Sequence, residues 1–218
     1  MKKILTIIIA VALVAAIAVG GTLAYLTSTA DNTVLQNTFV SDNTLLDITL
    51  NEAPVDSTTG LVTAGNRVTT NNYPIIPGEI MDKDPLITVK SGSQPCYVFA
   101  YVTNDIKLTA AAVGSTAKSV VTSIDIPTAT WTQVASSANG VLYVYSNASV
   151  PLIVAKSASD QALTKVFTKI TINKDLTTSD LKGTKSGSIT VKAYAHQATA
   201  SVTYADALAA AKALFSVT

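Results

Sequence analysis

Apolar and polar residues alternate along several short stretches of the chain, which is the pattern of a β-strand with one buried face. Residues 46–51 (LDITLN) predict such a strand, with Leu46, Ile48 and Leu50 on the buried face. Residues 189–193 (ITVKA) repeat the alternation. Both segments are therefore expected to be strands that leave their other face in water.

Two other runs, residues 96–102 (CYVFAYV) and 141–145 (VLYVY), are apolar on both faces. Strands of this kind are expected to be central and covered on both sides. Residues 91–95 (SGSQP) precede the first run and Asn139-Gly140 precedes the second, so a hairpin connection is predicted at each place. Residues 57–70 and 110–118 are rich in small polar residues and are predicted to be surface excursions.

The end of the chain follows the period of a helix instead. Thr203 and Asp206 have the spacing of a capping box at its start. The apolar stripe of this helix comprises Tyr204, Leu208, Ala211 and Phe215. Many short strands with turns between them predict an all-β fold, an antiparallel jelly-roll-like sandwich with a C-terminal α-helix and minor additional helices.

The start of the chain has the organisation of a secretory signal. Lysines at positions 2 and 3 precede a largely apolar run over residues 4–19, which is shorter than a comfortable membrane span. Small residues on both sides of Leu23 predict cleavage between Ala24 and Tyr25. Residues 1–24 are then a cleaved signal peptide and residues 25–218 a single β-sandwich domain, with an uncleaved membrane anchor as the alternative.

Composition narrows the function classes. The chain has 218 residues, of which 48% are hydrophobic and 13% charged, so it can bury a core. Its formal net charge is +1, two of its positive charges leave with the signal, and the remaining lysines are spread out. Nucleic acid is therefore not an expected partner. Cys96 is the single cysteine, so no disulfide forms within one chain, and it is expected to be a small buried hydrophobe.

No constellation of residues carries a recognisable chemistry. His196 is the only histidine, which excludes a histidine-rich zinc site, and nothing local supports a Cys96–His196 dyad. The alternation of its strand places His196 with Tyr194 and Lys192 on the more polar face. Nucleophile-elbow and phosphate-loop motifs are absent. The protein is therefore expected to be no enzyme, with no catalytic residue, no metal and no cofactor.

Three weaker signals have ordinary explanations. Asp82 and Asp84 form a D-x-D pair without the rest of a calcium loop, and are interpreted as a solvated strand entry. Trp131 and the tyrosines are more often core residues than a platform for sugars. Asn147-Ala148-Ser149 matches the glycosylation sequon, which is frequent by chance.

Several motifs, in order along the chain, resemble those of one family. Residues 20–27 (GGTLAYLT) resemble the junction G-G-T-x-A-[YF]-[FL]-[TS] that SipW-type signal peptidases cut. Residues 73–78 (YPIIPG) with 83–85 (KDP) resemble an internal "PG…KDP" segment, and residues 193–197 (AYAHQ) with the final helix resemble the ending. Over most of its length the chain resembles the TasA/CalY (camelysin-like) family of exported fibre proteins. Leu26 and His196 depart from the commoner residues of that family.

The resemblance implies a structural subunit of an extracellular fibre, in a biofilm matrix or on the cell surface. It implies polymerisation with copies of itself by donor-strand complementation, processing by a SipW-type signal peptidase, possible accessory fibre or matrix proteins, and contact with the membrane only through the signal. The expected donor is the new N-terminus, residues 25–40, with Val34, Leu35 and Phe39 as anchors. The alternative for this segment is pairing within its own domain.

Two other functions compete with the fibre subunit. Camelysin-like relatives imply a secreted metalloprotease, although this sequence offers one histidine and no recognised zinc motif. A monomeric surface adhesin or carbohydrate-binding module is the third interpretation.

Overall fold

The computed structural model describes residues 27–31, 46–104, 118–177, 180 and 188–218. Strand is the main secondary structure of the described residues, which form three antiparallel sheets and a C-terminal helix. The all-β class is therefore confirmed, whereas the jelly-roll arrangement stays a prediction. Residues 110–117 of the second predicted excursion lie outside the described residues.

The largest sheet has six strands. In spatial order they are β1 (Thr27–Asp31), β12 (Ile189–Gln197), β5 (Cys96–Asn104), β8 (Gly140–Asn147) and β7 (Trp131–Ser136), with β9 (Val150–Pro151) paired to the end of β8. The two apolar runs form β5 and most of β8, and both strands have neighbours on each side. This confirms the expectation that they are central.

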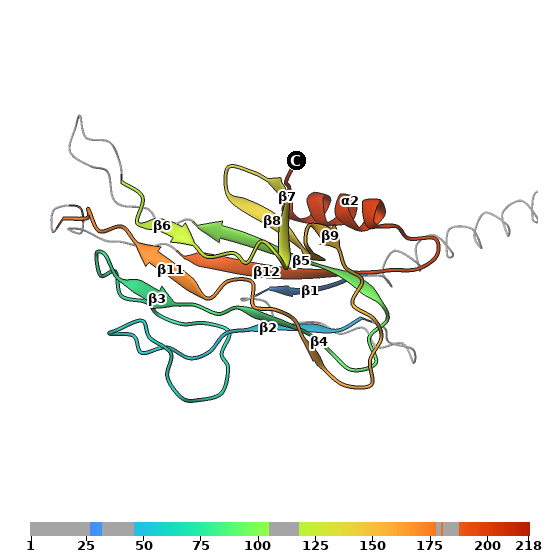
Figure 1. The fold of residues 1–218 in the computed structure, drawn as a ribbon, viewed down its shortest axis with the longest axis horizontal. Coiled ribbons are helices and arrows are strands. Elements are labelled where there is room, and N and C mark those ends of the chain that lie inside the picture. The colour runs from blue at the N-terminus through green and yellow to red at the C-terminus, as the bar shows by residue number, and fades with distance from the viewer. Residues whose placement is uncertain (1–26, 32–45, 105–117, 178–179, 181–187) are drawn as a thin grey trace, which may run out of the picture.

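Two three-stranded sheets complete the structure. One has the order β10 (Gln161–Ala162), β4 (Leu86–Val89), β2 (Ile48–Asn51), and the other β3 (Ile80–Asp82), β11 (Lys169–Ile172), β6 (Val121–Ile124). The sheet that contains β2 and β4 lies below the six-stranded sheet in Figure 1, and the helix α2 (Tyr204–Phe215) lies above it. The six-stranded sheet is thus covered on both faces, as its doubly apolar central strands require.

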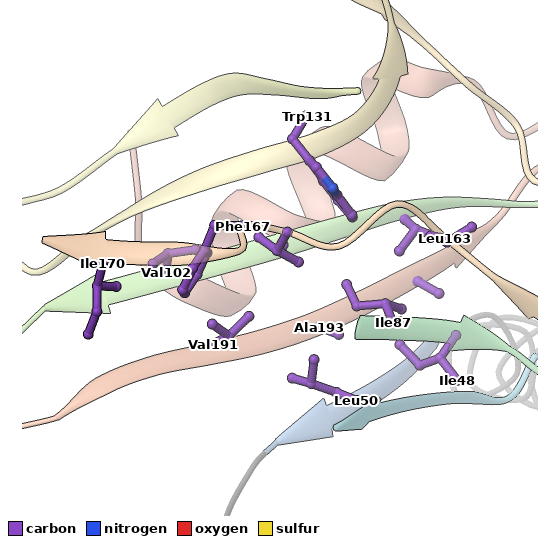
Figure 2. Close-up of a cluster of buried hydrophobic side chains, with 14 of the residues drawn as sticks. Ile48, Leu50, Ile87, Val102, Trp131, Leu163, Phe167, Ile170, Val191 and Ala193 are labelled. Atoms are coloured by element: carbon purple, nitrogen blue, oxygen red, sulfur yellow. The ribbon is translucent and has the colours of Figure 1, made fainter. Parts of the chain in front are cut away.

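The main core fills the space between the six-stranded sheet and the two small ones. Trp131 and Phe167 are fully buried in it. Val191 and Ala193 of β12 face Ile48 and Leu50 of β2 across this core (Figure 2). The predicted buried face of residues 46–50 is therefore confirmed. Close packing of such aliphatic side chains is the main favourable contribution to folding.

A second, more aromatic core lies under α2. Phe99 and Tyr194 pack there against Ala207 and Ala211 of the helix. The helix begins with the predicted capping box, since Thr203 accepts a hydrogen bond from the amide of Asp206 and Asp206 accepts one from that of Thr203. Within residues 189–193 the alternation is present, since Val191 and Ala193 are buried while Lys192 is half-buried. Because α2 covers the continuation of this side of β12, Tyr194 is only 2% exposed, and the predicted polar face is wrong for Tyr194 and His196.

One predicted hairpin is present and the other is not. β7 and β8 form a hairpin through the turn Ser137–Gly140, in which the Ser137 amide donates to the Gly140 carbonyl at 2.8 Å. Residues 91–95 instead connect β4 to β5, which belong to different sheets, so the hairpin predicted there is wrong. The first surface excursion is confirmed, since most of residues 57–70 are exposed.

Candidate functional site

The outer edge of the six-stranded sheet is formed by the first strand that the structure describes. β1 pairs antiparallel with β12, with Thr27 opposite His196 and Asp31 opposite Lys192. On its other side β12 pairs with β5 along all nine of its residues, without a break in register. β1 is therefore a short strand added to the edge of a longer and regular one (Figure 1).

β1 also lies along the rim of the main core. Val191, Ala193 and Ala195 of β12 belong to that core and are 3%, 1% and 0% exposed. β2 of the facing sheet lies close to both β1 and β12. β1 therefore has β12 on one side and β2 of the facing sheet beneath it.

The opposite edge of the same sheet is built differently. The register of β7 with β8 shifts between Gln133 and Ala135, which is a β-bulge. At the start of β7, Trp131 is fully buried and its indole N–H donates to the carbonyl oxygens of Thr164 and Lys165 at 3.0 and 3.2 Å. Bulges on edge strands hinder pairing with another chain. β7 is thus both anchored in the core and irregular at its edge.

The predicted site residues at the start of the chain lie mostly outside the described residues. This holds for the cleavage position Ala24-Tyr25 and for the anchors Val34, Leu35 and Phe39. The described part of the predicted donor is Thr27–Asp31, and here it pairs with β12 of its own chain. This is the pairing within one domain that the sequence left open as the alternative.

A group of buried charges lies where the sequence predicted a solvated strand entry, so that prediction is wrong. Lys83 and Asp84 are 7% and 6% exposed. The Lys83 ammonium lies 2.7 Å from a carboxylate oxygen of Glu52, whose side chain is also buried. Each charge has its partner close by, which is the condition under which burial of charge is tolerated.

Asp84 is the centre of a second ion cluster. Arg67 and Lys165 lie 3.1 and 2.8 Å from its carboxylate, and the Ala53 amide donates to it at 2.7 Å. Burial alone would raise the pKa of Asp84, but these hydrogen bonds outweigh it and hold the pKa below its ordinary value. Arg67 also donates to the side chain and carbonyl of Asn51 at 2.6 and 3.1 Å. The cluster thus fastens the surface excursion to the end of β2.

These charges have a structural role in the fold. Within the described ranges, no three histidine, cysteine or acidic side chains gather where they would hold a metal ion. The sequence did not predict the cluster, because Glu52, Arg67 and Asp84 are separated along the chain. The single arginine of the chain and the K-D-P run were the only signals available.

His196 is buried under α2. Its Nδ1 lies 2.8 Å from the hydroxyl of Tyr194, and burial lowers the pKa of His196 while the charge of Asp206 partly opposes this shift. Cys96 is fully buried in the main core, and burial raises the pKa of its thiol to about 12. His196 and Cys96 therefore lie on opposite faces of the sheet and form no dyad.

Comparison of the chain with protein-family models, with curated proteins and with solved structures found no match. Of the residues that the structure describes, none belong to a helix long and apolar enough to cross a membrane. The resemblance to the TasA/CalY family therefore rests on the sequence motifs alone.

Proposed function

We propose that the protein is the structural subunit of an extracellular fibre, in which each copy accepts the leading strand of another copy at the edge of β12. The observation that carries this proposal is the position of β1, an edge strand from the start of the chain. A strand in this position can leave and return without separating any other pair of strands. Exchange between copies is then a local event rather than an unfolding of the domain.

Departure of β1 would expose the edge of β12 as a template for another strand. The backbone groups along Lys192–His196 of β12 would lose their partners, and unpaired edges of this kind attract another strand. The same strand from a second copy would restore the same bonds, so the exchange changes little in the pairing itself. The segment TSTAD contains no large apolar residue, which makes backbone hydrogen bonds the main source of its affinity.

Signal cleavage would control when the exchange begins. If the chain is cut between Ala24 and Tyr25, β1 starts at the third residue of the processed chain. Before the cut, the membrane-embedded signal would hold β1 next to the bilayer and away from other copies. This is a hypothesis, and mixing uncleaved with processed chains in vesicles tests it: uncleaved chains that join fibres at the rate of processed ones would contradict it.

Removal of the donor is the direct test of the proposal. We expect processed chains that begin at Tyr25 to form fibres under negative-stain electron microscopy, and chains that begin at Ser41 to form none. The shortened chain should instead bind a synthetic peptide of residues 25–40. Fibres from the shortened chain would show that this segment is not the donor, and processed chains that stay monomeric in size-exclusion chromatography would favour a monomeric adhesin.

A disulfide between opposed positions distinguishes pairing within a chain from pairing between chains. Ala30 and Ala193 are directly opposite each other, and Cys96 is buried and so should not compete. In the double variant Ala30→Cys/Ala193→Cys, oxidation before assembly should link β1 covalently to β12 of its own chain and prevent fibre formation. Oxidation after assembly should give a ladder of covalent oligomers on a non-reducing gel, whereas only internal links would contradict exchange. Ala30→Cys alone is the control.

A further inference from the structure

The direction of β1 determines which end of the sandwich faces the subunit that donates the strand. Thr27 lies opposite His196, and Asp31 lies opposite Lys192, nearer the beginning of β12. A donated strand in the same register would therefore run toward the beginning of β12. The remainder of the donor chain would leave the acceptor at that end.

The register of the neighbouring strands shows what lies at this end. Ile189, the first residue of β12, is opposite Asn104, the last residue of β5. Next to it along β5, Thr103 is opposite Gly140 at the start of β8. The turn Ser137–Gly140 between β7 and β8 is therefore at the end of the sandwich where the donor chain would leave.

A cavity of about 290 Å³ lies at the same end. Its wall is largely apolar and includes Val102, Ile124 and Ile126. Ala138 and Asn139 of the turn also line it, and both are exposed. An apolar hollow next to an exposed turn provides a surface on which a partner can bury side chains.

The length of the connection limits how far away the donor domain can lie. Residues 32–45 join Asp31 to Leu46, just before β2, and an extended chain of this length spans at most about 50 Å. The domain of the donor therefore stays tethered within that distance of the end of the acceptor at which its strand leaves. The cavity and the turn are on that end.

We propose that the donor's domain packs in the fibre against this end of the sandwich. We call this surface, formed by the cavity and the turn Ser137–Gly140, the seat. The occupant is a second copy of this chain. The inference rests on the proposed function, because the exchanged strand is what brings the second copy to this end. It adds a contact between folded domains to the contact made by the strand.

A charge at the turn tests the seat. Ala138→Glu places a carboxylate at the exposed mouth of the cavity, and Ala209→Glu, on the exposed side of α2, is the matched control. We expect the first variant to slow fibre growth about tenfold or more, because an unpaired charge would be buried at the contact, and the second to grow as the unmodified chain does. Growth is followed by light scattering and electron microscopy.

The outcomes separate the two proposals. Chains that begin at Ser41 and carry Ala138→Glu should bind the peptide of residues 25–40 as tightly as those without it, since β12 and β5 lie between the strand site and the hairpin that carries the turn. If Ala138→Glu polymerises at the unmodified rate, the inferred contact between folded domains is wrong, while the proposed fibre subunit is not contradicted. If the unmodified chain forms no fibre, the proposed function itself fails.

Thiol labelling tests the seat without relying on loss of assembly. In Ala138→Cys and Ala209→Cys, a maleimide should label both positions in monomers, while Cys96 is buried in the core. In fibres, position 138 should react about tenfold more slowly or less, and position 209 should react as before. Equal reaction of position 138 in fibres and monomers would overturn the inference.

Discussion

β7 and β1 occupy opposite edges of the same six-stranded sheet, and they are held there by different means. β7 is joined to β8 by a short turn, has a bulge, and places Trp131 in the main core. β1 comes from the start of the chain and pairs with a long, regular strand. The β7 edge is protected by irregularity and anchoring, while the β1 edge is covered by a short strand that pairs with β12.

Under the proposed function, the two edges have different tasks. An anchored and bulged edge resists pairing with other chains. Under the proposed function, the regular edge exchanges a short strand near the start of the chain without disturbing the core. We therefore expect changes at the β7 edge to alter the stability of the domain, and changes at the β1 edge to alter assembly.

The largest effect is expected at Trp131. Trp131→Ala removes a fully buried ring and its two hydrogen bonds, and should lower the free energy of unfolding by about 3–5 kcal/mol. Trp131→Phe keeps most of the packing and should cost less. Urea unfolding measures both, and removal of residues 25–31 should cost less than Trp131→Ala. An equal or greater cost for that removal would break the contrast between the two edges.

The next effect concerns the support beneath the β1 edge. Glu52 and Lys83 lie beside Val191 of β12, around a small gap. Glu52→Ala leaves the Lys83 ammonium buried without its partner and should cost about 3 kcal/mol or more in urea unfolding. The double variant Glu52→Leu/Lys83→Met removes both charges and should recover most of the loss. If the double variant is as unstable as the single one, the pair is not the cause.

Local patterns were sufficient to predict many of the elements. The alternation in residues 46–50, the doubly apolar β5 and β8, and the capping box at Thr203 each depend on neighbours within a few residues. The side-chain period of a strand and the capping of a helix depend on residues that are close together in the sequence. A local pattern is therefore enough to predict them. This is also why the central position of β5 could be predicted.

Features that depend on distant partners were not predictable in this way. Lys83 is buried because Glu52 lies beside it, and a D-x-D pair alone gives no sign of that. The face of β12 that carries Tyr194 looked polar because the sequence does not show which strand α2 covers. Residues 91–95 have the composition of a hairpin turn, but the same residues also suit a crossing between sheets.

Gly140, in the hairpin of the β7 edge, should show an intermediate effect. A Cβ atom at this position would lie 2.7 Å from the Val102 carbonyl oxygen, so Gly140→Ala forces the strands apart. We expect a loss of about 1–3 kcal/mol in urea unfolding, typical of overpacking. The neighbouring and exposed Asn139→Ala is the control and should change stability little. A neutral Gly140→Ala would show that the hairpin yields more readily than its packing indicates.

At the β1 edge, the stability should depend on pH through His196, which lies opposite Thr27. The titratable groups that face this ring are Tyr194, Asp206 and Tyr97, which is opposite His196 on β5 and packs against Tyr204. Because burial lowers the pKa of His196 in the folded state below its ordinary value of 6.5, the unfolded chain binds the proton more readily. The contribution of neutral His196 to the free energy of unfolding should be fully present above about pH 6.5. It should be lost as the pH falls toward the folded-state pKa.

The loss should be smaller than that for Gly140→Ala, because Asp206 partly stabilises the charged ring. His196→Gln should remove this part of the pH dependence, as measured by urea midpoints between pH 7.5 and 5. A domain that becomes more stable on acidification because of His196 would contradict the assignment. Burial raises the pKa values of Tyr194 and Tyr204, so these two hydroxyls stay neutral over this range.

The smallest effect, and a gain, is expected at the turn between β8 and β9. Asn147 and Val150 are paired, and Ala148 and Ser149 between them have φ values of 47° and 71°, which favour glycine. Ser149→Gly should raise the free energy of unfolding by about 0.5–1 kcal/mol, as followed by urea unfolding. Ser146→Gly, in the regular part of β8, should lower it.

Since this turn is at neither edge, fibre growth by Ser149→Gly should equal that of the unmodified chain. Growth that slows in step with the added stability would mean that assembly requires unfolding of the whole domain, and the distinction between the two edges would lose its functional meaning.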